Sequence, residues 1–62
     1  TDVLNISQEV AKVEVYNVLG MKVKETHRPT RQVSLGDLGQ GVYIVNTTDK
    51  NAVRNSFKIL VK

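Results

Sequence analysis

Side chains that could perform acid–base, nucleophilic or metal chemistry are few in this sequence and lie far apart along it. The single histidine, His27, lies in a polar stretch beside Arg28 and Pro29. A catalytic triad requires a nucleophile, a base and an orienting acid in contact, and the serines lack the Gly-x-Ser-x-Gly context of a nucleophile elbow. These serines are Ser7, Ser34 and Ser56. We therefore interpret the histidine as a solvated loop residue and expect no catalytic residue.

Metal and cofactor binding are not indicated either. The chain has no cysteine and one histidine, and its six acidic residues are dispersed, whereas a metal site with so few nitrogen and sulfur ligands needs clustered carboxylates. Asp37 and Asp49 are better explained as turn formers than as an acid–base pair. The glycine-rich stretch 36–41 is followed by neither Lys-Ser/Thr nor a helix pattern, so it is not a phosphate-binding loop. We expect no metal ligand, no cofactor and no enzymatic activity.

The charge pattern does not favour a nucleic-acid or membrane partner. Nine Lys and Arg residues against six Asp and Glu give a net charge of +3, but the basic residues are scattered from Lys12 to Lys62. Single-stranded nucleic-acid sites combine clustered basic residues with aromatic stacking partners, and the only aromatic residues here are Tyr16, Tyr43 and Phe57. No apolar run approaches the ~18 residues of a membrane-spanning helix. We expect no nucleic-acid partner and no membrane insertion.

The elements that must position these residues are short β-strands, because apolar residues recur with a period of two. The alternating runs cover residues 3–6, 12–16, 21–25, 32–35, 42–45 and 53–62, and the turns between them include 17–20, 26–31 and 49–51. Residues 42–45 are apolar on both faces, as in a central strand. Strands at this spacing predict an all-β protein, an antiparallel β-sandwich of about six to seven short strands.

A Gly-x-Tyr sequence at Gly41 to Tyr43 opens one of these strands. It resembles the tyrosine corner of immunoglobulin-like sandwiches, where the hydroxyl bonds to backbone a few residues upstream. We therefore expect an immunoglobulin-like sandwich, with a positive φ at Gly20. Leu19, Leu35 and Leu38 are expected to fill the core under the loops. The fold-defining turn positions are predicted to be Asn17, Gly20, Gly36, Gly39, Gly41 and Tyr43.

The length of the chain predicts a single domain over residues 1–62. Such a small domain buries only about 60% of the surface that its unfolded chain exposes, and no disulfide can stabilise this one. The chain begins at Thr1 without an initiator methionine or a leader, so we interpret it as a fragment of a longer secreted protein.

Three sequence blocks carry a family resemblance. They are VEVYNVLGMKV at residues 13–23, VSLGDLGQGVYIV at 33–45 and FKILVK at 57–62. Their order and spacing closely resemble the type A C-terminal sorting domain of the type IX secretion system of Gram-negative bacteria, from about Leu4 to Lys62. Members of this family usually carry Pro-Asn-Pro just before the first strand, and this chain does not. We therefore expect one strand or its lead-in to be missing.

The resemblance implies a C-terminal sorting signal. Such a domain directs an attached cargo protein through the outer-membrane type IX translocon and is then usually cleaved off at the cell surface. The implied partners are the translocon, its surface sorting peptidase and a covalently attached upstream cargo domain. The implied route is export to the periplasm and then to the outer-membrane surface or the extracellular space. The cleavage site is expected upstream of Thr1.

The last segment is the candidate recognition element, because a terminal strand at a sheet edge has unpaired main-chain groups that a partner can extend. We assign translocon recognition to Lys58, Leu60, Val61 and Lys62, with Phe57, Ile59 and Val61 anchoring the strand in the core. In the alternative interpretation, Leu60 contacts a neighbouring loop and the lysines are plain solvated charges.

Two other function classes remain open at this stage. The first is a carbohydrate-binding or adhesion module on a similar sandwich, which the absence of tryptophan and the presence of only two tyrosines disfavour. The second is a passive stability domain of a secreted enzyme. Its deletion would lower the stability of the parent protein without changing the export route.

Overall fold

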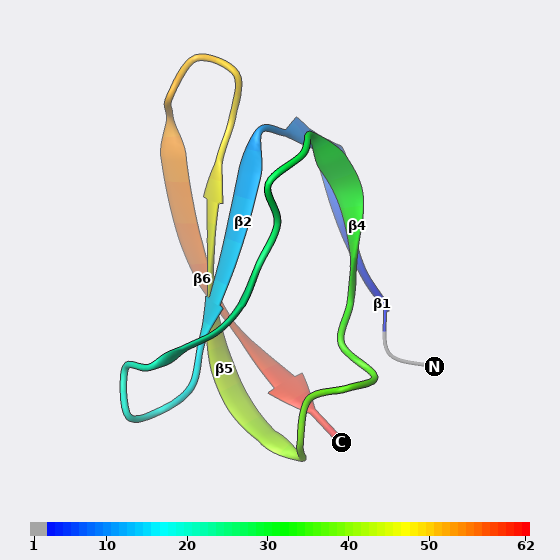
Figure 1. The fold of residues 1–62 in the computed structure, drawn as a ribbon, viewed down its shortest axis with the longest axis vertical. Coiled ribbons are helices and arrows are strands. Elements are labelled where there is room, and N and C mark those ends of the chain that lie inside the picture. The colour runs from blue at the N-terminus through cyan, green and yellow to red at the C-terminus, as the bar shows by residue number, and fades with distance from the viewer. Residues whose placement is uncertain (1–2) are drawn as a thin grey trace.

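A computed structural model describes residues 3–62 and contains, within them, six β-strands in two antiparallel sheets (Figure 1). The four-stranded sheet has the order β3-β2-β5-β6, and the two-stranded sheet pairs β1 with β4. The all-β sandwich predicted from the sequence is therefore confirmed. The strands are β1 (Val3–Val10), β2 (Lys12–Tyr16), β3 (Lys22–Glu25), β4 (Thr30–Ser34), β5 (Gly41–Thr48) and β6 (Arg54–Val61).

The strand order is that of an immunoglobulin-type sandwich. Taken as strands B, C, C′, E, F and G, the six strands place C′-C-F-G in one sheet and B-E in the other. The tyrosine corner belongs at the start of strand F, and Tyr43 lies near the start of β5. Its hydroxyl donates a hydrogen bond of 2.7 Å to the carbonyl oxygen of Gly39, the contact that this motif predicts.

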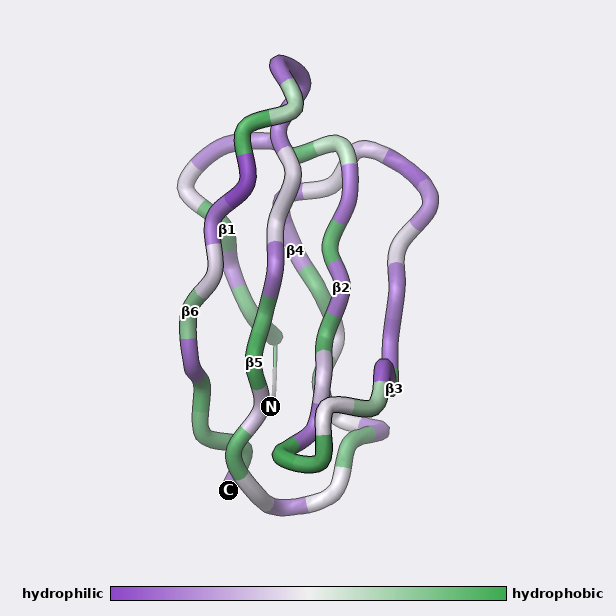
Figure 2. The backbone as a smooth tube through the Cα atoms, turned by 90° about the vertical axis from the view of Figure 1, so that its left-hand side faces the viewer, coloured by the Kyte–Doolittle hydropathy of each residue, from purple (hydrophilic) through white to green (hydrophobic). Residues whose placement is uncertain are grey.

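The core lies between the two sheets and is built mainly from valines at alternate strand positions. Val13 and Val15 of β2 and Val45 of β5 are completely buried. Figure 2 shows the matching alternation of hydrophobic and hydrophilic residues along β2. β-Branched side chains suit such a pleated, covered surface. The other buried hydrophobic residues are Val10, Val33, Leu35, Tyr43 and Val61.

Two expectations about buried residues need correction. Leu19 is 79% exposed, since it lies in the β2–β3 turn beyond the end of the sheet, whereas Leu35 is buried and Leu38 packs against the core. Phe57 is 38% exposed and does not anchor β6 in the core. The reason is that a two-stranded sheet covers only part of a four-stranded one. The inner face of β6 is therefore exposed at Phe57, half-buried at Ile59 and buried at Val61.

The two hairpin turns of the large sheet use the same hydrogen bonds. In the β2–β3 turn, the Asn17 side-chain oxygen accepts from the amides of Leu19 and Met21, at 2.9 and 3.0 Å. In the β5–β6 turn, the Asp49 carboxylate accepts from the amides of Asn51 and Val53, at 2.8 and 2.9 Å. These bonds define Asx turns, which asparagine and aspartate form readily.

The residue two positions before the second β-strand of each hairpin has a positive φ. It is Gly20 in the first turn, with φ of 82° as predicted, and Ala52 in the second, with φ of 64°. Gly41 also has a φ of 153° that side-chain-bearing residues rarely adopt. Gly36 and Gly39 show no such φ, and a Cβ atom at either would meet at most an ordinary contact. The structure therefore gives no backbone reason for glycine at those two predicted turn positions.

Candidate functional site

The outer edge of β6 is the candidate site. β6 pairs with β5 over all eight of its residues, from Arg54 opposite Thr48 to Val61 opposite Gly41, without a register shift. Its other side faces no strand in the part of the chain that the structure describes, and Figure 2 places β6 at the margin of its sheet. The predicted edge position of the last strand is therefore confirmed.

The other strand edges within residues 3–62 are shorter or irregular. β3 has four residues, and β4 has five and follows Pro29. β1 has eight residues, but its register against β4 shifts between Asn5 and Val10, and Arg31 Nη2 donates to the carbonyl oxygen of Ser7 at 3.3 Å in that region. Short strands and bulges blunt an edge against strand addition. Among the described strands, β6 therefore offers the longest regular edge.

The four residues predicted for recognition do not all present side chains to solvent. Leu60 is 60% exposed, and Lys58 and Lys62 are exposed as well. Val61 is only 4% exposed because its side chain belongs to the hydrophobic core. A partner at this edge can contact Lys58, Leu60 and Lys62 through their side chains, whereas Val61 has its side chain in the core and pairs with Gly41 of β5.

The main-chain groups at this edge follow from the hairpin geometry. The amide of Asp49 donates to the carbonyl oxygen of Val53 at 3.0 Å. Antiparallel pairs alternate between hydrogen-bonded and non-hydrogen-bonded along a ladder. We therefore expect the amides of Ser56, Lys58 and Leu60 to face the free side of β6, where no strand of the described chain takes up their hydrogen-bonding capacity.

A shallow apolar hollow lies beside Lys58 on the outer face of the sheet. It has a volume of about 530 Å³. Val42 and Ile44 of β5 form its floor, opposite Leu60 and Lys58 of β6. This hollow is not evident from the sequence, because residues from three strands and one turn come together only in the folded sheet. Its lining consists of Tyr16, Asn17, Val18, Gly20, Val42, Ile44, Asn46 and Lys58.

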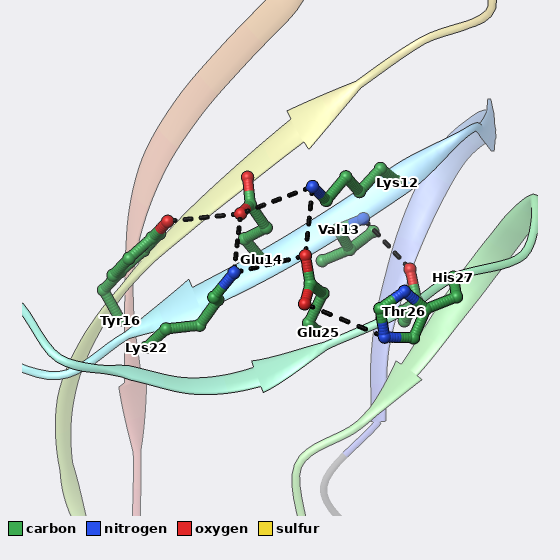
Figure 3. A network of polar contacts seen from close by, with 8 residues as sticks. All are labelled: Lys12, Val13, Glu14, Tyr16, Lys22, Glu25, Thr26 and His27. Carbon is green, nitrogen blue, oxygen red and sulfur yellow. Dashed lines mark hydrogen bonds and ion pairs between the residues drawn. The ribbon is translucent and has the colours of Figure 1, made fainter.

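At the opposite margin of the same sheet, charged side chains neutralise one another (Figure 3). Glu14 of β2 lies directly opposite Glu25 of β3, a like-charge pair that destabilises a sheet by itself. Two lysines bridge both carboxylates: Lys12 lies 3.7 Å from Glu14 and 3.0 Å from Glu25, and Lys22 lies 3.3 Å and 3.2 Å away. We call these four residues the β2–β3 ion-pair ring.

The contacts within the ring shift the pKa of each member so that its charged form is favoured. The hydrogen bond from Lys22 lowers the pKa of Glu14, and that from Lys12 lowers the pKa of Glu25. The bonds to Glu25 raise the pKa values of Lys12 and Lys22. The ring is thus fully ionised at neutral pH and leaves no net charge for a partner.

His27 lies beside this ring and not in a catalytic arrangement. Its Nε2 atom is 3.7 Å from Glu25, and its side chain is 80% exposed. Within residues 3–62, no group of three or more His, Cys, Asp or Glu side chains could hold a metal ion. The described residues also include no helix of the length and apolarity needed to cross a membrane.

Comparison with known families identifies the class of protein. The sequence profile of the secretion system C-terminal sorting domain family matches residues 1–62. No curated protein and no solved structure gives a significant match. The chain therefore belongs to the family of type IX secretion C-terminal sorting domains.

Membership in this family defines the general role of the chain. It is a C-terminal sorting signal for type IX secretion, and the family is not an enzyme family. Family membership also implies interaction with the secretion machinery, attachment to a cargo protein and transit of the secreted protein to the cell surface.

Proposed function

We propose that residues 1–62 form one sorting domain that carries an attached upstream cargo through the outer-membrane type IX translocon, and that the translocon reads the free edge of β6. On this proposal the cargo first reaches the periplasm. A surface sorting peptidase then removes the domain upstream of Thr1. The observation that carries the proposal is the uninterrupted eight-residue edge of β6.

Strand addition to this edge supplies both affinity and specificity. A partner strand takes up the free amides and carbonyl groups of β6, and its alternate side chains contact those of β6. Leu60 is 60% exposed between two lysines, so it offers an apolar contact that water covers in the free domain. Burial of such a side chain on binding is favourable by roughly 25 cal/mol per Å² of apolar surface.

A secretion assay tests this proposal. The domain is fused to a reporter with a periplasmic leader in a bacterium that has a type IX system, and reporter at the cell surface is measured. The double variant Leu60→Asp, Lys62→Ala is expected to retain the reporter in the periplasm. The matched control is Met21→Asp, Lys50→Ala, because Met21 is also 60% exposed and Lys50 is an exposed turn lysine.

Circular dichroism melts of the purified domains must show that both double variants fold. The expected result is surface delivery of the control and loss of delivery for the β6 variant. Normal delivery of a folded β6 variant would refute the reading of this edge. Equal loss for both variants would indicate that the whole surface, and not β6, is recognised.

A further inference from the structure

We propose that the partner segment that adds to β6 is acidic: an extended strand with carboxylate side chains opposite Lys58 and Lys62 and an apolar side chain opposite Leu60. This inference rests on the proposed function of β6 as the surface that is read, and it specifies the chemistry of the partner.

The distribution of ion pairs is the first support. Four lysines each have a carboxylate partner within the domain, the closest contacts being Lys12 to Glu25 at 3.0 Å, Lys22 to Glu25 at 3.2 Å, Lys24 to Asp37 at 2.9 Å and Lys50 to Glu9 at 3.3 Å. No ion pair among residues 3–62 involves Lys58 or Lys62. The lysines of β2 and β3 are thus paired internally, whereas Lys58 and Lys62 have no ion-pair partner within residues 3–62.

The spacing of these charges is the second support. Residues 58, 60 and 62 alternate along one extended segment, so they project to the same side of the sheet. An added strand continues this pattern, with its own alternate side chains directly beside them. Opposite charges at such cross-strand positions are favourable and like charges are unfavourable. The Lys-Leu-Lys pattern therefore selects an acidic–apolar–acidic strand.

A second copy of this chain meets like charges at this edge in the antiparallel register centred on Lys58. In an antiparallel pair of two β6 strands centred on Lys58, that residue faces its own copy, and Arg54 faces Lys62. Like charges then meet at both places, which opposes pairing. Arg54, at the start of β6, also has no ion pair among residues 3–62, so the positive charge of this edge extends from Arg54 through Lys58 to Lys62.

Peptide binding to the purified 62-residue chain tests the inference. One probe is an eight-residue peptide that alternates valine and glutamate, and the other is the same peptide with lysine in place of glutamate. Binding is followed by NMR titration at low ionic strength. The acidic peptide is expected to bind at least about tenfold more tightly than the basic one. The largest amide shifts are expected in β6, and added salt weakens the binding.

Further variants test whether the charge preference and the binding site belong to β6. In Lys58→Glu, Lys62→Glu, the basic peptide is expected to become the tighter ligand. The matched control Arg28→Glu, Lys50→Glu changes net charge equally on two loops and should keep the original preference. Ser56→Pro removes an amide that we place on the free edge, and it should weaken binding of the acidic peptide at least about tenfold.

Every other outcome overturns the inference. Equal binding of both peptides would show that charge does not determine the preference. Absence of binding would show that β6 does not accept an added strand. Amide shifts centred on β1 or β4 would place the partner at another edge. Dimerisation through β6 in gel filtration would identify a second copy as the occupant. If Leu60→Asp, Lys62→Ala blocks secretion but the peptides show no charge preference, the proposed function stands without an acidic partner. If the preference is found but secretion is normal, the proposed function fails.

Discussion

The two matching hairpin turns give a prediction with an internal control. Gly20 and Ala52 occupy the same position in their Asx turns, and both have a positive φ, of 82° and 64°. The amide of each residue donates to the main-chain carbonyl oxygen of the first turn residue at 3.0 Å. Replacing Ala52 by glycine should therefore stabilise the domain, and replacing Gly20 by alanine should destabilise it.

The magnitude follows from two opposing terms. An L-residue other than glycine pays roughly 1–2 kcal/mol in the left-handed helical region. Glycine loses more backbone freedom on folding, which costs roughly 0.5–1 kcal/mol relative to alanine. No steric term enters at Gly20, because a Cβ atom there meets nothing within 4 Å. The net change in the free energy of unfolding is about 0.5–1 kcal/mol for each substitution. Ala52→Gly should raise the free energy of unfolding by this amount, and Gly20→Ala should lower it.

Thermal unfolding followed by circular dichroism measures these changes. In a domain of this size, 1 kcal/mol corresponds to about 4–8 °C in Tm. Ala52→Gly should raise the Tm by a few degrees, and Gly20→Ala should lower it by a similar amount. The turns lie at opposite ends of the sheet (Figure 1), so the double variant should return close to the starting Tm. A lower Tm for Ala52→Gly would show that the backbone at this position does not control the stability of the hairpin.

Three further perturbations test other parts of the structure. Tyr43→Phe should lower the free energy of unfolding by on the order of 1 kcal/mol, measured by urea titration, since it removes the hydrogen bond of the tyrosine corner. Glu14 and Glu25 have pKa values below their ordinary value of 4.5 in the folded state, so their stabilisation is complete above that pH and is lost as the pH falls through the lowered values. Tm measured between pH 7 and pH 3 should show this loss, and Glu14→Gln, Glu25→Gln should flatten it. Ser56→Pro should leave the domain folded in a thermal melt, whereas Asn55→Pro should unfold it, because proline is tolerated in a strand only where its missing amide faces a free edge.

The sequence was sufficient to predict the number and order of the strands, because these depend on local signals. Their ends were predicted less well: β1 runs to Val10 and not only to residue 6, and β4 begins at Thr30, inside the turn predicted at 26–31. β5 covers Gly41–Thr48 where only 42–45 was predicted. A period of two in hydrophobicity identifies a strand with one covered face, and Asn17 with Gly20 identifies the first hairpin. The tyrosine corner was readable for the same reason, since Tyr43 and Gly39 are four residues apart and their bond is set by the turn between them.

Burial could not be predicted as well, because it depends on how many strands cover each face. Phe57 and Ile59 have the same periodicity as buried residues elsewhere, yet the small sheet leaves Phe57 38% exposed. The ion-pair ring was also not predicted. It requires the register that sets Glu14 opposite Glu25, and a shift of one residue would separate them.

The candidate site was predictable only in part. The alternation of Lys58, Leu60 and Lys62 identified the outward face of the last strand, but not that its pairing with β5 is unbroken. The irregular edges of β1 and the short edges of β3 and β4 emerge only from the sheet registers. The role of β6 as an available edge is therefore a property of the whole sandwich.

We propose that Lys58 and Lys62 affect both the solubility of the domain and its choice of partner. An edge that is long and regular enough to accept a partner strand is also able to pair with other copies of the same chain. Positive charges spaced along that edge oppose self-pairing, because identical strands bring like charges together. On our proposal the same charges favour a strand of opposite sign, so one set of side chains would both disfavour self-pairing and select the partner. On the proposed function, Lys58 and Lys62 can serve both purposes because no ion pair among residues 3–62 involves either of them.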